Sequence, residues 1–450
     1  MVTQQNLDLL FQVRILAGQL GFAGYIDGKT MKDLRTIILA AGKGTRMNSD
    51  IPKVLHTVCG RPIIQYVLDI TKGLGSLKTY VILGHKGAAV KTALDGMFIG
   101  VEQARLLGTA DAVKCAESHL RNYRGDVLIL SGDTPLLKLA TVKRLVQKHK
   151  RSDAACTFLT AVVHNPKGYG RVIRNESGAA VAIREDKDAS GYERDIAEIN
   201  VGVYCCRSKE LFGALKAVKI NAKKKEFYLT DIIEYFSQQG RRIETVETED
   251  PSEGLGVNTR EDLATAESVV RRDILRDFMI QGVTIIDPGT TYIDAGAKIG
   301  SDTVIYPFTF IEGDVRIGNH CRIGPFARLR LGTRIEDRVE IGNFTEVSRT
   351  RVGTKSFMKH FSFLGDTSVG AQVNIGAGVV TANFDGRQKN KTKIGDGAFI
   401  GSDAVLIAPV KIGKKAVVGA GSVVTKGKTV PDGSVAVGVP AKIISGGRRP

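Results

Sequence analysis

The sequence lacks any apolar run that approaches the ~18 residues a membrane-spanning helix needs. Its N-terminus also lacks a basic region followed by an apolar core and a cleavage site, so it does not predict a signal peptide. Cysteine pairs at Cys-x-x-Cys or metal-ligand spacing are missing as well. We therefore expect free thiols, a reducing cytoplasmic location and no membrane partner. The six cysteines are Cys59, Cys115, Cys156, Cys205, Cys206 and Cys321.

Acidic residues are too few to balance the basic ones, since 47 Asp and Glu accompany 64 Lys and Arg, a formal net charge of +17. A basic balance favours anionic partners. A nucleic-acid surface would be a dense basic stripe with interleaved aromatics, whereas Lys and Arg are scattered along this sequence. The charge therefore favours phosphorylated small molecules, and we expect no nucleic acid among the partners.

From Leu34 to about Asn258, short apolar runs alternate with amphipathic stretches. This alternation predicts a largely parallel, doubly wound (Rossmann-like) α/β sheet, in which ligands bind beyond the carboxyl ends of the strands. Residues 1–33 precede it as an extension of unassigned role, apolar enough for a short packed helix. The predicted strands are residues 35–42, 78–85, 126–133 and 156–163, and the predicted helices are Ile63–Gly73, Ala110–Leu120 and Ala140–Lys150.

After about Gly282, branched apolar residues recur every six positions, often followed by glycine. This period is typical of the hexapeptide β-helix, in which three short strands make one triangular coil and the apolar residue points inward. A β-sandwich rich in glycine turns is the alternative, but its strands do not keep a six-residue register over many steps. The register is interrupted at 379–394, which predicts a projecting loop. The clearest series is Ile394, Ile400, Leu406, Ile412, Val418 and Val424; Ile317, Ile323, Leu329, Ile335, Ile341 and Val347 form two shorter ones.

A glycine-rich turn follows the first predicted strand and reads LAAGKGTRM, from Leu39 to Met47. Small residues let backbone N–H groups approach phosphate oxygens closely, and Lys43 and Arg46 add positive charge. The spacing fits neither a Walker loop nor the dinucleotide-binding glycine motif. Further along the chain, Asp133 ends an apolar strand in LSGDTPLL, and Lys53 stands in IPKVLH.

LAAGKGTRM with the downstream PKVLH resembles the sugar-1-phosphate nucleotidyltransferase family. Further segments match in order: Gln103 with Leu107-Gly108-Thr109, the LSGDTPLL strand end, GYGR, Glu185, Asn200, EFYLTD and GVN. Together they are similar to the bifunctional N-acetylglucosamine-1-phosphate uridylyltransferase / glucosamine-1-phosphate N-acetyltransferase family, over about residues 34–445. The resemblance implies a nucleotidyltransferase domain at 34–260, a linker helix at 261–281, a left-handed parallel β-helix acyltransferase domain at 282–445 and a tail at 446–450.

For the first site, the resemblance implies that UTP and N-acetylglucosamine 1-phosphate react to give UDP-N-acetylglucosamine and pyrophosphate. Protein groups then act by positioning and by charge neutralisation. The catalytic cations are Lys53 and Arg46, and Mg²⁺ is held by Asp133 and Asn258. The nucleotide is bound by Leu39, Ala40, Ala41, Gly42, Lys43, Gly44, Gln103, Gly108 and Thr109, and the sugar phosphate by Gly170, Glu185, Asn200 and Asn258. Where members of the family often carry a second Gln, this chain has Leu106.

For the second site, the segment around His360 resembles the catalytic histidine segment of the family. An imidazole that titrates near neutrality suits a general base for glucosamine 1-phosphate attacking acetyl-CoA. Glu346 is expected to orient or polarise it. By resemblance, the sugar phosphate contacts Arg330, Phe363, Asn374 and Lys389, and acetyl-CoA contacts Ala377, Asn383, Phe384, Ser402 and Ala420. The resemblance also implies a homotrimer.

Three substitutions distinguish the second site from the family pattern. Ser348 replaces a phosphate-binding Lys, Phe363 replaces a Tyr, and Gly438 replaces an Arg. Strand alternation places the neighbouring Arg349 on the opposite face from Ser348. Two alternatives to the bifunctional enzyme therefore stay open: a single-activity nucleotidyltransferase with a structural or altered β-helix, and a sugar-nucleotide sensor.

Overall fold

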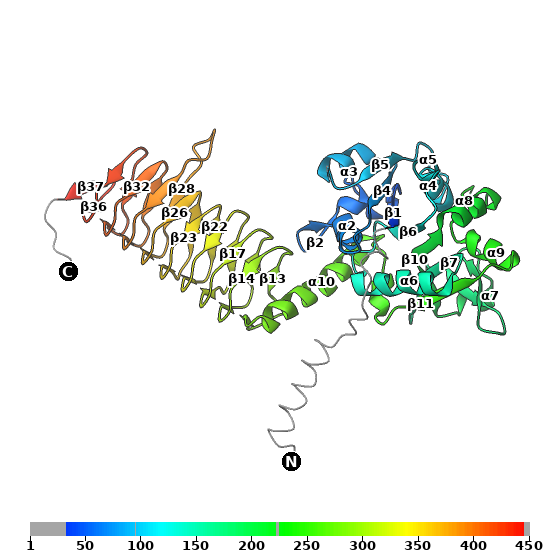
Figure 1. The fold of residues 1–450 in the computed structure, drawn as a ribbon. Helices are drawn as coiled ribbons and strands as arrows, with labels where there is room; N and C mark the ends of the chain where they lie inside the picture. Colours follow the sequence, from blue (N-terminus) through cyan, green and yellow to red (C-terminus); the bar gives the residue numbers. More distant parts are fainter. Residues whose placement is uncertain (1–32, 95, 222–224, 445–450) are drawn as a thin grey trace, which may run out of the picture. The chain divides into compact units, whose positions relative to one another are not determined.

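The computed structural model describes residues 33–94, 96–221 and 225–444 (Figure 1). Of these, residues 33–54 and 64–256 form one compact unit, and residues 55–63 and 257–444 form a second. The helix expected in the N-terminal extension and the tail at 446–450 lie outside the described residues. No described helix is long and apolar enough to cross a membrane.

The first unit is built on one twisted sheet whose strand order is β11-β7-β10-β6-β1-β4-β5. β1 pairs in parallel with β4 and β6, while β10 runs antiparallel to β6 and β7. Ile37, Ile38 and Leu128 are fully buried, as expected where helices cover both faces. The strands are β1 (Leu34–Ala40), β4 (Lys78–Leu83), β5 (Ile99–Glu102), β6 (Asp126–Ser131), β7 (Cys156–Val162), β8 (Arg171–Arg174), β9 (Ala180–Arg184), β10 (Glu198–Arg207) and β11 (Ile243–Glu247).

The helices of this unit follow the amphipathic stretches of the sequence. α2 has the predicted bounds, but the helix predicted at Ala110–Leu120 is wrong as one element. The N–H of Ala116 bonds to the carbonyl of Val113, a tight turn that separates α4 from α5. The helices are α2 (Ile63–Gly73), α3 (Gly87–Ala93), α4 (Thr109–Lys114), α5 (Glu117–Leu120), α6 (Leu139–Ser152), α7 (Gly191–Arg194), α8 (Ser208–Ala217) and α9 (Asp231–Gln238), with short 3₁₀ turns η1 (Thr45–Met47), η2 (Lys53–Leu55) and η3 (Pro251–Gly254). Lys53 and Val54 of η2 belong to the first unit, and Leu55 to the second.

The second unit begins with the hairpin β2 (Thr57–Val58) and β3 (Arg61–Pro62) and the helix α10 (Arg260–Ile280). Thr259 caps α10 in a reciprocal capping box with Asp262, which stabilises the first turn. The hairpin is tied to this helix because the N–H of Cys59 donates to the Glu267 carboxylate at 2.6 Å. The helix predicted at 261–281 is thus present, and it belongs to the same compact unit as the β-helix.

Strands of two to four residues then wind into a prism with three parallel-strand faces in the described part of the chain (Figure 1). Each strand places one side chain outward and the next inward, so Ile317, Ile335 and Ile400 are buried in the prism. All the apolar residues of the predicted six-residue series are buried, which confirms that interpretation. Left-handed backbone at the corners, as at Phe308, Phe326 and Phe344, turns the chain from one face to the next.

Face A contains β12 (Thr284–Ile285), β15 (Val304–Ile305), β18 (Arg322–Ile323), β21 (Glu340–Ile341), β24 (Phe357–Met358), β27 (Asn374–Ile375), β30 (Phe399–Ile400), β33 (Val417–Val418), β36 (Val435–Val437) and the antiparallel β37 (Lys442–Ile444). Face B contains β13 (Tyr292–Ile293), β16 (Phe310–Ile311), β19 (Ala327–Leu329), β22 (Thr345–Ser348), β25 (Ser362–Gly365), β28 (Val380–Ala382), β31 (Val405–Ile407) and β34 (Val423–Val424). Face C contains β14 (Lys298–Ile299), β17 (Arg316–Ile317), β20 (Arg334–Ile335), β23 (Arg351–Val352), β26 (Thr367–Val369), β29 (Thr392–Ile394), β32 (Val410–Ile412) and β35 (Thr429–Val430).

The predicted projecting loop is present between β28 and β29. An isolated bridge between Phe384 and Lys389 closes it, and the carboxylate of Asp385 accepts two backbone N–H groups within it. The loop is therefore an ordered excursion from the prism rather than an interruption of the core.

Candidate functional site

A cleft of about 600 Å³ opens at the carboxyl ends of β1 and β6, where the doubly wound fold predicts a ligand. The predicted nucleotide-binding residues all line it, together with Lys53, Asp133 and Glu185. These residues come from sequence positions as distant as Leu39 and Glu185, so the fold brings the separate motifs to one place. Another hollow of about 700 Å³, between α6 and β11, contains none of the predicted residues.

Two glycines of the cleft are required by their surroundings. Gly44 has a φ of +61°, and a Cβ there would stand 2.8 Å from the Cβ of Lys53. Gly108 has a φ of +105°, and a Cβ there would stand 2.5 Å from the carbonyl oxygen of Phe227. A side chain at either position would strain the backbone and collide with a wall of the cleft.

Lys53 and Asp133 meet inside this cleft, where the ammonium group donates to Oδ2 of the carboxylate. Asp133 follows the buried strand β6, and Lys53 stands in η2 after the glycine-rich loop. The Asp133 carboxylate, beside the glycine-rich loop, offers the oxygen donors that Mg²⁺ prefers. Among the described residues, no group of three or more His, Cys, Asp or Glu side chains could hold a metal by itself.

Gln103 is buried and its amide donates to Asp111 at 2.8 Å and to the carbonyl of Gly108 at 3.2 Å. These bonds fix the amide at the wall of the cleft. Leu106, the departure from the family pattern, lines the same cleft.

Glu185 lies across the cleft and accepts a hydrogen bond from the Thr230 hydroxyl at 2.9 Å. Burial raises the pKa of Glu185, because the charged form loses hydration, and the nearby Asp188 adds to the rise. Burial and the charge of Glu185 together raise the pKa of Asp231, at the first turn of α9, to about 6.

Four predicted residues do not line the cleft: Arg46, Gly170, Asn200 and Asn258. Arg46 is exposed in η1. The hydrogen bonds of Asn200 go to neighbouring strand residues: its amide donates to the Tyr204 hydroxyl at 2.7 Å, its Oδ1 accepts the N–H of Gly202 at 3.1 Å, and its backbone N–H donates to the carbonyl of Gly170 at 2.8 Å. Asn258 belongs to the second unit. Conversely, the structure adds residues that the sequence did not single out for the cleft: His85, Ser131 and Tyr228.

The residues of the predicted second site occupy face B and its two edges. The carbonyl of Ala377 accepts the N–H of Asp403, and that of Ser402 accepts the N–H of Gly421. Ala377, Ser402 and Ala420 therefore hold equivalent corner positions in successive coils. The registers of the strands on either side place the exposed His360 at the same corner one coil earlier. Glu346 and Phe363 are register partners on the outer side of face B. Asn374 lies on face A, and Asn383, Phe384 and Lys389 belong to the projecting loop.

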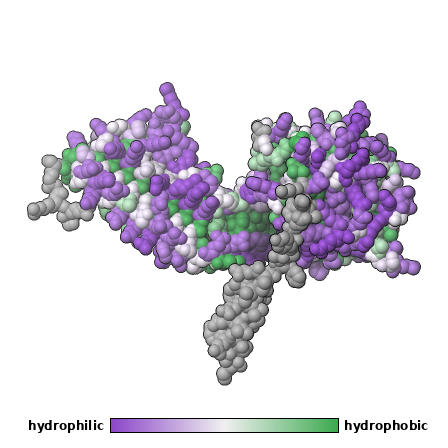
Figure 2. Space-filling view, in the orientation of Figure 1, coloured by the Kyte–Doolittle hydropathy of each residue, from purple (hydrophilic) through white to green (hydrophobic). Residues whose placement is uncertain are grey.

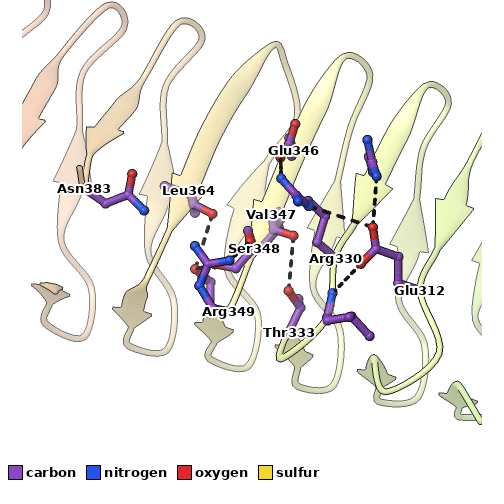
Figure 3. A network of polar contacts seen from close by, with 12 residues as sticks. Glu312, Arg330, Thr333, Glu346, Val347, Ser348, Arg349, Leu364 and Asn383 are labelled. Atoms are coloured by element: carbon purple, nitrogen blue, oxygen red, sulfur yellow. Dashed lines mark hydrogen bonds and ion pairs between the residues drawn. The ribbon is translucent and has the colours of Figure 1, made fainter. Parts of the chain in front are cut away.

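In this structure Glu346 forms no hydrogen bond with His360. Glu346 instead accepts a hydrogen bond from Arg330 at 2.9 Å, and Arg330 also approaches Glu312 at 3.8 Å (Figure 3). The physical reason is position: His360 stands at the corner before β25, whereas Glu346 and Arg330 project from face B. His360 has no hydrogen bond or ion pair within residues 257–444.

The expectation that Arg349 points away from Ser348 is wrong. β22 ends at Ser348, and Arg349 has a φ of +48°, so strand alternation no longer applies. Its guanidinium donates to the Ser348 hydroxyl at 2.8 Å (Figure 3). It also donates to both oxygens of Asp366, at 2.6 and 2.9 Å. This pairing holds the pKa of Asp366 below its usual range, and Asn383 also donates to Asp366 at 2.5 Å.

Comparison with known proteins defines the class. Residues 36–234 match the MobA-like NTP transferase domain, and residues 296–330 and 391–426 match the bacterial transferase hexapeptide model. The chain is thus a nucleotidyltransferase joined to a hexapeptide-repeat transferase, and the predicted Rossmann-like domain followed by a left-handed parallel β-helix is confirmed.

Curated relatives cover nearly the whole chain. The bifunctional protein GlmU of Shouchella clausii is 45% identical over 86% of this chain and 93% of its own length. Those of Pelotomaculum thermopropionicum and Pelobacter propionicus are 44% and 41% identical over 84% and 90% of this chain, and 90% and 96% of their own. A crystal structure of UDP-glucose pyrophosphorylase complexed with UDP-glucose aligns with 53% of this chain and 98% of its own at 16% identity, with a TM-score of 0.45. The chain belongs to the bifunctional GlmU family, as a nucleotidyltransferase and an acetyltransferase.

Proposed function

We propose that the cleft of the first unit binds UTP and N-acetylglucosamine 1-phosphate and produces UDP-N-acetylglucosamine and pyrophosphate. The observation that carries this proposal is the single cleft that collects the glycine-rich loop, the Lys53–Asp133 pair, Gln103 and Glu185. The loop backbone takes the triphosphate, Gln103 faces the base, and Glu185 faces the sugar. A phosphate oxygen of the sugar phosphate attacks the α-phosphorus, and the bond to pyrophosphate breaks.

The side chains of the cleft assist by charge and position rather than by covalent chemistry. Lys53 stabilises negative charge on the phosphates, and Lys43 adds positive charge at the rim of the loop. Mg²⁺ bound by Asp133, with Asn258 assigned from the family motif, would supply further charge neutralisation. The proposed role of Arg46 as a catalytic cation depends on the family motif alone, because Arg46 does not line the cleft.

We further propose that face B and its edges transfer an acetyl group from acetyl-CoA to glucosamine 1-phosphate. His360 accepts the proton that the amine loses as it attacks the thioester carbonyl. A C–N bond forms, the C–S bond breaks, and CoA leaves as a thiolate, which then takes the proton from His360 and becomes the free thiol. Arg330 is the guanidinium for the sugar phosphate, with Phe363, Asn374 and Lys389 around the sugar. The corner residues Ala377, Ser402 and Ala420 and the loop residues Asn383 and Phe384 hold acetyl-CoA.

We propose a homotrimer in the cytoplasm, with domain bounds at 34–260, 261–281 and 282–445. Exposed aromatic rings on the prism support self-association, since Phe308, Phe326 and Phe344 stack in a ladder along one corner with centroids 4.8 Å apart. Free cysteines fit a reducing compartment.

Pyrophosphate release from UTP and N-acetylglucosamine 1-phosphate tests the first site. Asp133→Ala should reduce the rate by at least about a hundredfold, since it removes a group placed at the developing charge. Asp50→Ala, at an exposed carboxylate outside the cleft, is the matched control. Equal rates in the two variants would reject the assignment of Asp133.

Free-thiol release from acetyl-CoA in the presence of glucosamine 1-phosphate tests the second site. His360→Ala should abolish most of this release, because a general base typically contributes about 10² to 10⁴ in rate. His320→Ala, an exposed histidine at another corner of the same prism, is the control. Thiol release that survives in His360→Ala would show that another group accepts the proton.

A further inference from the structure

The positive charges on face C form one row that is interrupted once, at Ser368, although they are scattered in the sequence. Successive strands of this face pair in register: Lys298 with Arg316, Arg316 with Arg334, and Arg334 with Arg351. After Ser368 the same register continues through Lys393 and Lys411 to Thr429. We call the set Lys298, Arg316, Arg334, Arg351, Lys393 and Lys411 the basic row.

Side chains of the basic row project outward, because their inward neighbours fill the prism. All are exposed except Arg334, which is half-buried. Neighbouring strands of a sheet lie about 4.8 Å apart, so the row is a dense line of charge. Within the described chain, Lys298, Arg316, Lys393 and Lys411 have no ion pair, whereas Arg351 pairs with Glu336 at 2.9 Å.

Acidic residues flank the row at the corners, but their carboxylates are engaged by the turns. Asp314 accepts the N–H of Gly332 at 2.7 Å, and Asp337 accepts the N–H of Asn319 at 2.8 Å. Exposed Lys415 and Lys428 add further positive charge beside the row, whereas Lys414 pairs with Asp396 at 3.2 Å. The outward positions of the described strands of face C therefore carry six cations and no carboxylate.

The other two faces have a different character. Face A presents Phe357 and Phe399 outward, and face B presents Tyr292, Phe310 and Val380. Figure 2 shows hydrophobic side chains gathered in bands on the visible side of the β-helix. Contact between copies of the chain fits these apolar faces, whereas like charges oppose the pairing of one basic row with another.

We propose that the basic row is a docking surface for an anionic lipid bilayer. The strands of face C hold the charges side by side on one sheet, so a flat surface of phosphate headgroups meets them together. Nucleic acid is the less suitable polyanion, because the outward positions of face C carry no aromatic ring on which a base could stack in the described strands.

Docking of this kind is peripheral and reversible, since face C has no outward apolar side chain to insert among its described strands. It also differs from the expectation of no membrane partner, which depended on the lack of a membrane-spanning run and of a signal peptide. In the sequence, Lys and Arg are scattered. The register of successive coils places these cations beside one another on face C, although the sequence shows no cluster of them.

Co-sedimentation with vesicles tests this proposal on the full chain. The vesicles contain phosphatidylcholine with or without about 30 mol% phosphatidylglycerol, in salt from about 0.02 to 0.3 M. The chain should bind only the anionic vesicles, and binding should decrease as salt rises. Each removed cation lowers binding about fivefold, so Lys393→Gln with Lys411→Gln should weaken it on the order of twentyfold.

The matched control is Lys209→Gln with Lys219→Gln, which removes the same charge from exposed positions of the first unit. It should bind vesicles nearly as the unchanged chain does, and both double variants should retain both transferase activities, since none of the four lysines is in a proposed site. An equal loss in the two double variants would show that total charge, not the basic row, drives binding. No binding to anionic vesicles at low salt, or binding to an oligonucleotide duplex instead, would overturn the proposal.

Discussion

Replacing Lys53 with Gln should let a divalent cation reach Asp133 without nucleotide. In the structure the Lys53 ammonium is bound to the Asp133 carboxylate, with the two side chains 14% and 21% exposed. Two unit charges about 4 Å apart interact by about 4 kcal/mol at the dielectric near a protein surface. Hydration of the separated charges offsets most of this, so about 1 to 2 kcal/mol remains. We therefore expect Lys53→Gln to lower the Kd for Mn²⁺ alone by roughly tenfold.

The assay is Mn²⁺ binding followed by electron paramagnetic resonance, in which only free Mn²⁺ gives the sharp signal. Lys43→Gln is the matched control, because it removes an equal charge from the same cleft but does not contact Asp133. Lys53→Arg should keep the metal out as Lys does, since the charge is retained. If Lys53→Gln and Lys43→Gln bind Mn²⁺ equally, the contact between Lys53 and Asp133 does not control metal access. Pyrophosphate release should nevertheless decrease in Lys53→Gln, since the phosphates lose a cation.

Three further predictions concern single positions. Gly108→Ala should raise the KM for UTP and lower the melting temperature of the first unit, because its Cβ would meet Phe227; calorimetry and a UTP titration that match the unchanged chain would contradict this. Asp231→Asn should stabilise the fold by roughly 1 kcal/mol at pH 7, after discounting for solvent screening. The pKa of Asp231 in the folded protein is about 6, above the usual 3.8. Ionisation of Asp231 therefore destabilises the fold increasingly between about pH 4 and 6, and thermal melts of the variant and the unchanged chain at pH 4 should show no difference. Arg330→Ala should raise the KM for glucosamine 1-phosphate about tenfold or more without changing pyrophosphate release, since one guanidinium–phosphate contact is lost; an unchanged KM in the thiol assay would exclude Arg330.

Much of the first site could be predicted because its motifs are local. The glycine-rich loop lies in one short segment after β1, and Asp133 follows β6 directly. Both lie in the cleft because the cleft opens at the carboxyl ends of these two strands. Arg46 shows the limit of this reasoning. It belongs to the same loop, yet it lies in a 3₁₀ turn that directs it away from the cleft lining, and nothing in the residue pattern indicates that turn.

The sequence by itself determined the two-part architecture, because hydrophobic period distinguishes a wound α/β sheet from a six-residue coil. It also determined the motifs of the cleft. Tertiary structure alone decided which polar groups meet: Glu346 with Arg330, Arg349 with Ser348 and Asp366, and the charges of the basic row. Lys393 and Lys411 stand one regular coil of 18 residues apart, but the steps from Arg351 to Ser368 and from Ser368 to Lys393 take 17 and 25 residues, and only the structure shows that these positions are neighbours. Long-range register depends on the length of every turn and loop between them, and no local pattern encodes that sum.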